Sequence, residues 1–192
     1  VLKAAARMKS GKMDVSQGHT SDIFLHAPPI LFDKLAAVFR SFLVHGTITQ
    51  SALACSFMPL LKSARKDPTQ FDSWRAVAGA SQLLKLFEYV ILGLWGNYLD
   101  SDSLQLGLEP GTGTDHCSWL LYSVAEHHYL RGSPTLCGLL DVKKGFPSVK
   151  FANLFRSCLE KKELPPVVVR VLMFMYKEQD GHIQLQGHRS TS

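Results

Sequence analysis

Apolar residues recur along this chain at helical spacing in several segments, which are separated by shorter apolar runs typical of strands. One segment opens with Pro28 and Pro29 and closes at Gly46, signals that favour the start and the end of a helix. Its apolar positions are Ile30, Leu31, Leu35, Val38, Phe39, Phe42 and Leu43. Helices are predicted over residues 27–45, 82–97, 116–130, 148–162 and 165–176, the last of which is valine-rich and also fits a strand.

Short apolar runs predict the strands. Residues 52–61 contain Pro59, which predicts an edge strand because proline cannot donate to a β-ladder. A polar, charged loop leads from this run to a second strand over residues 74–78, so the pair predicts a long hairpin with a basic tip. A continuous apolar run over residues 135–140 predicts a buried strand, and residues 181–187 predict another. Together the elements predict an α/β or α+β fold with a helix-rich body.

Composition narrows the class of protein. Of 192 residues, 46% are hydrophobic and 19% are charged, as in ordinary globular proteins. No uncharged apolar run of membrane-spanning length occurs, so no membrane partner is expected. The four cysteines form no Cys-x-x-Cys pair and three have apolar surroundings, which predicts buried free thiols in a reducing compartment. The chain begins with Val and shows no signal-peptide pattern, so we expect a piece of a longer nuclear or cytoplasmic protein that is not secreted.

The positive charge of the chain lies in its first half. Residues 1–96 carry 11 basic and 6 acidic side chains, whereas residues 97–192 carry 10 of each. A mildly basic half is compatible with a polyanionic partner such as nucleic acid, but this charge density does not establish one.

A carboxylate follows the apolar run over residues 135–140. Functional groups often stand at the ends of strands, where a rigid backbone fixes their position, and Asp141 there could ligate a divalent cation. Alternatively, Asp141 makes turn or cap hydrogen bonds before the next helix, which spacing alone favours. The pairs His116-Cys117 and His127-His128 match no familiar zinc-ligand spacing.

The segment TLCGLLDVKKGFPSVKFANLFRSCLEKKELP resembles motif A of the reverse transcriptases of non-LTR (LINE-type) retrotransposons. That motif has an apolar strand, a catalytic Asp, an aromatic residue and then a helix. The upstream stretch FMPLLKSARKDPTQFDSWRAVAGASQLLKLFEYVIL is similar to the fingers motifs of the same family, and SDSLQLGLEPGTGTDHCSWLL is similar to the connecting segment. The motifs stand in the family's order and cover nearly the whole chain.

The resemblance implies a right-hand polymerase fold and RNA-directed DNA synthesis by nucleotidyl transfer. Its partners would be an RNA template, a DNA primer and dNTPs, and its cofactor Mg²⁺. The resemblance further implies a helical lead-in over residues 1–50 and a fingers-like region with a basic hairpin over residues 51–133. Residues 134–192 then correspond to the start of a palm, with the motif A strand and helix.

Carried over residue by residue, the resemblance assigns metal binding to the Asp141 carboxylate and to the backbone carbonyl of Val142. It assigns Phe146 to the steric gate that screens the sugar 2′-hydroxyl. Lys62 and Arg75 match the residues that grip the incoming triphosphate. Arginine offers a planar fork and lysine a point charge to phosphate oxygens. The alternative for Lys62 and Arg75 is a solvated hairpin tip.

The chain departs from the family at motif A, where Pro147 replaces a usual Asp and Gly145 a usual Ala. It also contains no Asp-Asp pair, although chemistry with two metal ions needs more than one carboxylate. We therefore expect a truncated reverse-transcriptase-like fragment that is inactive alone. The alternative is a non-catalytic helical module that binds nucleic acid or protein.

Overall fold

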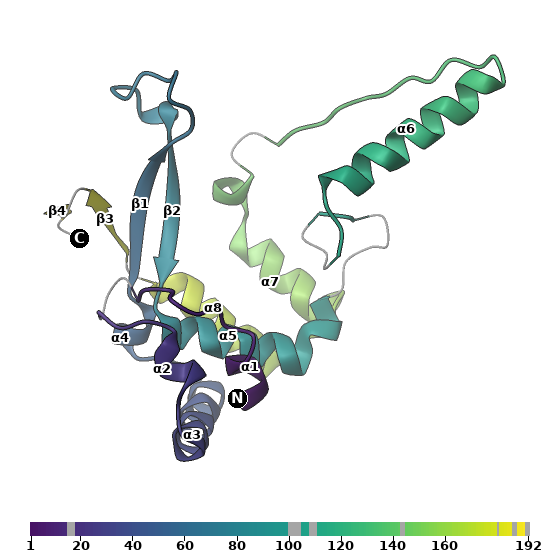
Figure 1. Cartoon of the computed structure of the whole chain (residues 1–192). Helices are drawn as coiled ribbons and strands as arrows, with labels where there is room; N and C mark the ends of the chain where they lie inside the picture. The colour runs from purple at the N-terminus through teal and green to yellow at the C-terminus, as the bar shows by residue number, and fades with distance from the viewer. Residues whose placement is uncertain are drawn as a thin grey trace. The chain divides into compact units, whose positions relative to one another are not determined.

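The computed structural model describes residues 1–14, 18–99, 105–107, 111–142, 145–179, 181–185 and 188–190 (Figure 1). It combines helices with a small sheet, so the predicted mixed α+β class is confirmed. The chain divides into two compact units. The first unit joins residues 1–99 to residues 151–192, and the second unit comprises residues 100–150.

Helices form most of the first unit. They are α1 (Leu2–Ala5), α2 (Asp22–Leu25), α3 (Pro29–His45), α4 (Gln50–Leu53), α5 (Gln82–Trp95), α7 (Phe151–Glu160) and α8 (Pro166–Glu178), with 3₁₀ turns η1 (Phe71–Ser73) and η2 (Gly96–Leu99). Helix α3 is followed by its C-cap Gly46, which has a φ of 70° in the left-handed region. Ser81 is the N-cap of helix α5, and its Oγ accepts a hydrogen bond from the N–H of Leu84 at 3.1 Å.

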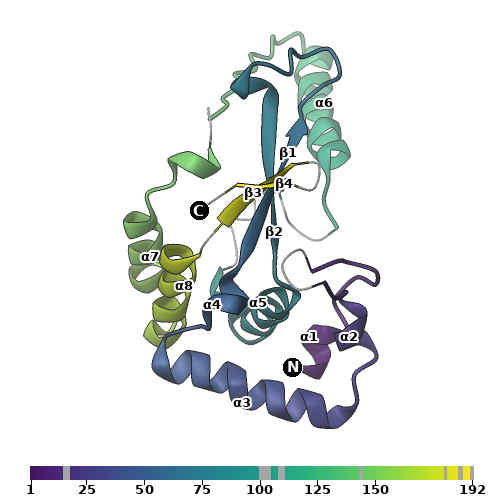
Figure 2. The same cartoon turned by 90° about the vertical axis from the view of Figure 1, so that its left-hand side faces the viewer.

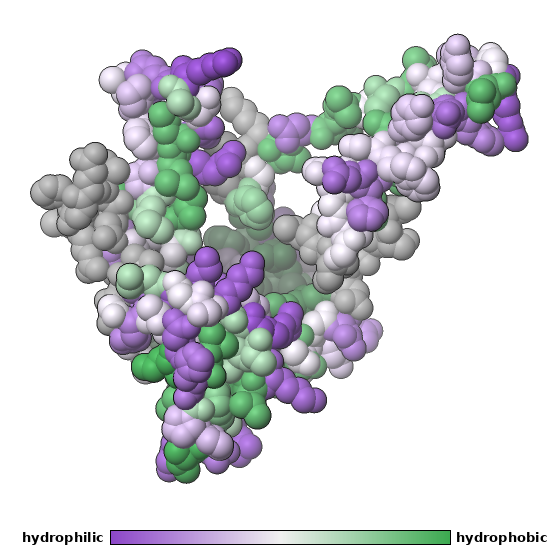
Figure 3. All heavy atoms as spheres, viewed as in Figure 1, coloured by the Kyte–Doolittle hydropathy of each residue, from purple (hydrophilic) through white to green (hydrophobic). Residues whose placement is uncertain are grey.

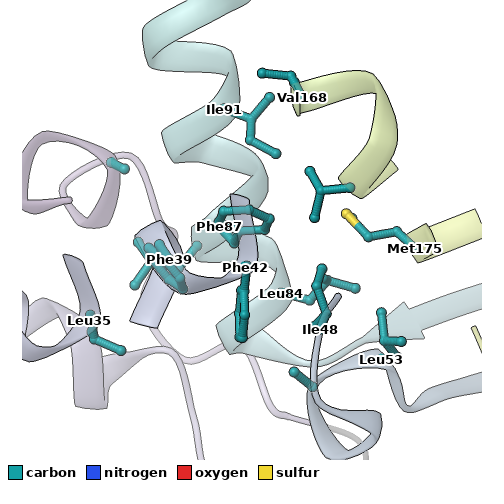
Figure 4. Close-up of a cluster of buried hydrophobic side chains, with 14 of the residues drawn as sticks. Leu35, Phe39, Phe42, Ile48, Leu53, Leu84, Phe87, Ile91, Val168 and Met175 are labelled. Atoms are coloured by element: carbon teal, nitrogen blue, oxygen red, sulfur yellow. The ribbon is translucent and has the colours of Figure 1, made fainter. Parts of the chain in front are cut away.

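The core of the first unit lies where α3, α5 and α8 pack together (Figure 4). The Phe87 ring of α5 lies 5.0 Å from that of Phe39 and 5.5 Å from that of Phe42, both on α3. Met175 of α8 is buried in the same cluster. Aromatic side chains contribute large apolar areas to a core, so this cluster stabilises the packing of the three helices.

The strands β1 (Cys55–Leu61), β2 (Trp74–Ala80), β3 (Gly181–Leu185) and β4 (His188–Arg189) form one sheet in the order β2-β1-β3-β4 (Figure 2). The predicted hairpin is confirmed, since β1 and β2 pair antiparallel along their length. The prediction that the first strand is an edge strand is wrong, because β3 runs parallel beside it. However, β3 pairs only with Cys55–Phe57, so Pro59 lies beyond its reach.

The second unit contains α6 (Thr114–Leu130) and the 3₁₀ turn η3 (Phe146–Ser148). The buried strand predicted over residues 135–140 is wrong: this segment has no regular structure, and its leucines are almost fully exposed. A buried strand needs neighbours that satisfy its N–H and C=O groups, and the described strands pair only with one another. Residues 135–140 therefore have the composition of a strand but no partner among the strands that the structure describes.

The four cysteines are free thiols, but only Cys55 is buried. Its burial raises the pKa of the Cys55 thiol. Cys158 is half-buried, whereas Cys117 and Cys137 of the second unit are exposed. The prediction of three buried thiols is therefore wrong, because apolar sequence neighbours do not bury a residue unless the segment itself packs against a core.

Candidate functional site

The hairpin of β1 and β2 brings together the two cations that the sequence singled out for triphosphate binding. Arg75 stands opposite Leu60 in the β-ladder, and the N–H of Lys62 donates to the carbonyl of Ser73 at 2.9 Å, which extends the pairing by one step. Lys62 is the first residue after β1 and Arg75 the second residue of β2. Both cations therefore stand at the end of the hairpin where the strands meet the loop.

Hydrogen bonds within the loop fix the end of the hairpin. The Lys62 ammonium donates to the carbonyl of Asp72 at 2.7 Å, and the indole N–H of Trp74 donates to the carbonyl of Pro68 at 2.8 Å. The Lys62 bond leaves two ammonium protons for another acceptor. The Trp74 indole ties the loop to the strand that carries Arg75. The loop thus holds its cations on an ordered turn.

The end of the hairpin carries a net positive charge, because its four basic side chains outnumber its two carboxylates. Lys62, Arg65, Lys66 and Arg75 are exposed, and Asp67 and Asp72 stand among them. Hydrogen bonds from the hydroxyl and the N–H of Thr69 hold the pKa of Asp67 below its ordinary value, so this carboxylate stays ionised. In the space-filling view, the end of the hairpin is mainly hydrophilic and hydrophobic side chains line the strands below it (Figure 3).

Sequence reasoning missed an aromatic side chain beside these cations. Phe71 lies in η1, within the hairpin loop, and its side chain is 89% exposed. A large ring in that position contributes nothing to the core, but it offers a flat surface to a stacking partner. The available signal was a single aromatic residue inside a loop that is otherwise polar and charged.

The other candidate residues belong to the second unit. Asp141 and Val142 are exposed and follow the irregular segment over residues 135–140. Phe146 begins η3, a 3₁₀ turn that precedes α7, and is 89% exposed. These residues thus lie in a different unit from Lys62 and Arg75, and the roles that the resemblance assigns to them stay predictions.

The donors at Asp141 do not match a site for two metal ions. The assigned ligands are one carboxylate and the backbone carbonyl of Val142, whereas a pair of divalent cations needs several hard oxygen ligands. Within the described residues, no group of three or more His, Cys, Asp and Glu side chains could hold a metal ion.

No family model matches the chain, and no curated protein matches it. Among the helices that the structure describes, none has the length and apolar character needed to cross a membrane.

Proposed function

We propose that this chain is part of a reverse-transcriptase-like domain, in which the β1–β2 hairpin grips the phosphates of a nucleotide or a nucleic acid. The observation that carries the proposal is that Arg75 pairs with Leu60 and that the N–H of Lys62 bonds the carbonyl of Ser73, so both cations stand where the strands meet the hairpin loop. The order of the motifs along the sequence supports the same assignment. The proposal concerns binding, because the donors at Asp141 are too few for the family's metal chemistry.

The two cations suit phosphate recognition in different ways. The Arg75 guanidinium can donate two parallel hydrogen bonds to one phosphate group, and the Lys62 ammonium adds a point charge. Lys62 is already oriented by the carbonyl of Asp72, so less side-chain freedom is lost when it binds an anion. Arg65 and Lys66 extend the positive charge along the loop, where the next phosphates of a strand would pass.

Phe71 gives the hairpin a second means of contact. Unpaired bases stack on exposed aromatic rings in many proteins that bind single strands, and such contacts tolerate any base. A ring that is 89% exposed beside several cations combines the two elements of such a surface. We expect binding that is weak, independent of sequence and sensitive to salt.

The first experiment measures binding of a labelled RNA–DNA template-primer by fluorescence anisotropy at several salt concentrations. Lys62, Arg65, Lys66 and Arg75 are replaced together by alanine. A plot of the logarithm of the affinity against the logarithm of the salt concentration should have a shallower slope in this variant. The slope should change by roughly 0.7–0.9 for each phosphate that the protein no longer neutralises. The control variant removes equal charge elsewhere in the first unit, at Lys9, Lys34, Arg40 and Lys161, and should bind like wild type. Unchanged binding by the hairpin variant would rule out the proposal.

A second experiment separates stacking from charge. Phe71→Ala should weaken binding to single-stranded RNA by about 1–3 kcal/mol for each stacked base and leave the salt dependence unchanged. Phe71→Tyr should restore the affinity because it keeps the ring. If Phe71→Ala binds like wild type, the ring has no part in the site.

A third experiment distinguishes a polymerase-like site from a general nucleic-acid-binding module. A fluorescent dNTP should bind wild type, and the double variant Lys62→Ala, Arg75→Ala should lose this binding. The corresponding nucleoside, which lacks phosphates, should not bind. A chain that binds nucleic acid without binding dNTPs would favour the non-catalytic module instead.

A further inference from the structure

Helices α7 and α8 of the first unit lie side by side (Figure 2). A pocket of about 480 Å³ lies between them, next to Gly46 at the end of α3, and all of its lining residues belong to this unit. Small-molecule sites in proteins usually enclose roughly 300–1,000 Å³ and are lined mainly by apolar and aromatic side chains, with a few polar groups. The pocket therefore has the size and the kind of lining that suit a small organic molecule.

Three aromatic rings of the lining form one cluster. The Tyr176 ring lies 5.1 Å from that of Phe151 and 5.8 Å from that of Phe155. Phe155 is buried, whereas Phe151 and Tyr176 are 47% and 51% exposed. Rings gain from offset and edge-to-face contacts with other rings, and a flat aromatic ligand supplies such contacts. Met173 also lines the pocket, and its sulfur makes favourable contacts with aromatic rings as well.

The charged side chains of the lining are both cations, Arg170 and Lys177, and no Asp or Glu occurs among the described residues that line the pocket. The Nη2 of Arg170 donates to the carbonyls of Leu43 and Val44, at 3.0 and 2.7 Å, which fixes the position of the guanidinium. A guanidinium has five N–H donors, so these two bonds leave three for another acceptor. The charge of the lining thus favours an anionic ligand.

Lys177 has a carboxylate beside it that a ligand would have to replace. The Lys177 ammonium lies 3.1 Å from Oε1 of Glu178, and the two side chains are 82% and 41% exposed. Glu178 does not line the pocket. Exposed ion pairs of this kind contribute little free energy, so the ammonium can exchange Glu178 for the acidic group of a ligand at small cost.

We propose that the pocket between α7 and α8 binds a small organic anion with a flat aromatic body. The aromatic body lies among the rings of the lining, and the acidic group of the ligand pairs with Arg170 and Lys177. The rings favour a flat body and the two cations favour a negative charge, so both features are needed for tight binding. No residue of the hairpin lines the pocket, and the inference does not depend on phosphate binding there.

Two fluorescent dyes test the pocket in the full chain, anilinonaphthalene sulfonate and phenylnaphthylamine. They share the same aromatic body, and only the first carries a negative charge. Fluorescence titration should show saturable binding of both dyes. The anionic dye should bind roughly 2–25-fold more tightly, because each exposed ion pair contributes up to about fivefold. A chain that binds neither dye overturns the proposal, as does equal affinity for the two dyes.

Removal of the two cations should abolish the preference for the anionic dye. Arg170→Gln combined with Lys177→Gln should lower the affinity for the anionic dye to that for the neutral dye, whose own affinity should stay unchanged. Because Arg170 also supports the end of α3, Lys177→Gln is made alone as well and should weaken the anionic dye roughly 2–5-fold. The matched control, Lys34→Gln with Arg40→Gln, removes the same charges from exposed positions of α3 and should bind both dyes like wild type. Pocket variants that keep the full preference for the anionic dye overturn the proposal.

Replacement of one ring tests whether the dyes lie in the pocket. Phe151→Leu keeps an apolar side chain but removes the ring, so both dyes should bind roughly 2–12-fold more weakly. The control is Tyr98→Leu, which removes a ring of η2 that is 42% exposed and lies outside the pocket, and it should change neither affinity. Circular dichroism checks that both variants keep the helix content of wild type. A folded Phe151→Leu variant that binds both dyes like wild type places them elsewhere and contradicts the proposal.

Discussion

The carboxylate of Asp14 accepts a hydrogen bond from the backbone N–H of Gln82 at 2.8 Å, across 68 positions of sequence. Asp14 is only 3% exposed, and Gln82 is the first residue of α5. The side-chain amide of Gln82 donates in turn to the carbonyl of Met13 at 3.2 Å. This exchange ties the N-terminal loop to the helix that follows the hairpin, and it places a negative charge at the positive end of α5.

Removal of the Asp14 carboxylate should therefore loosen the base of the hairpin. Asp14→Ala leaves the buried N–H of Gln82 without this acceptor, and we expect a loss of about 1–3 kcal/mol in the free energy of unfolding. Urea unfolding followed by circular dichroism measures the change. Asp33→Ala, on an exposed position of α3, is the control and should be nearly neutral. Equal stability of the two variants would contradict a supporting role for Asp14.

The hairpin could be predicted from the sequence because its signals are local. Two apolar runs flank a polar loop, and their alternation fixes which side chains share a face. The bond between Asp14 and Gln82 joins distant segments, so no local pattern reveals it.

The buried face of α3 was predicted less well. Ile30 and Val38 belong to the apolar pattern, yet they are 60% and 40% exposed, while Phe32 outside that pattern is 8% exposed. The helix is apolar over so much of its circumference that packing against α5 and α8 decides which face is buried. Periodicity alone identifies the helix but not its rotation.

The segment over residues 135–140 shows the same limit for strands. Its apolar run fits a buried strand, but a strand exists only when another strand pairs with it. Leu136 and Leu140 are 97% and 101% exposed, because no described strand of the chain pairs with this segment. The β-propensity of a segment indicates that it can form a strand, but it does not identify the strand that would pair with it.

The network around Asp22 should make stability depend on pH. Hydroxyls of Ser10 and Thr20, at 2.6 and 2.8 Å, and the N–H of Gly11, at 3.0 Å, hold the pKa of Asp22 below its ordinary value. Because the pKa of Asp22 is lower in the folded state, its ionised form stabilises the fold at any pH above the unfolded pKa of about 4. This stabilisation is lost as the pH falls through the pKa of the folded state. Asp22→Asn should lower the melting temperature at pH 7, and the difference from wild type should shrink steadily below pH 4. A difference that is constant with pH would show that the charge of Asp22 contributes nothing.

The lone carboxylate at Asp141 predicts the outcome of an activity assay. Purified chain should extend no DNA primer on an RNA template, with either Mg²⁺ or Mn²⁺, because two-metal transfer needs more carboxylates than the sequence supplies there. Incorporation of labelled dNTPs into primer measures the activity, with an established reverse transcriptase as the positive control. Extension that Asp141→Asn abolishes would overturn the expectation that the chain is inactive alone.

The effect of replacing Gly46 should depend on Arg170, because Gly46 has a left-handed backbone and lies against the Arg170 side chain. Gly46 has a φ of 70°, and a β-carbon there would collide with Arg170, whose Nη2 donates to the last carbonyls of α3, those of Leu43 and Val44, at 3.0 and 2.7 Å. Gly46→Ala should therefore cost more than the roughly 1–2 kcal/mol of the left-handed backbone alone. Gly11→Ala is the matched control, because Gly11 has a φ of 69° with open space around it. In an Arg170→Ala background, the cost of Gly46→Ala should fall towards that of Gly11→Ala, since the collision is gone. A cost that is the same in both backgrounds would leave only the backbone conformation to explain the glycine.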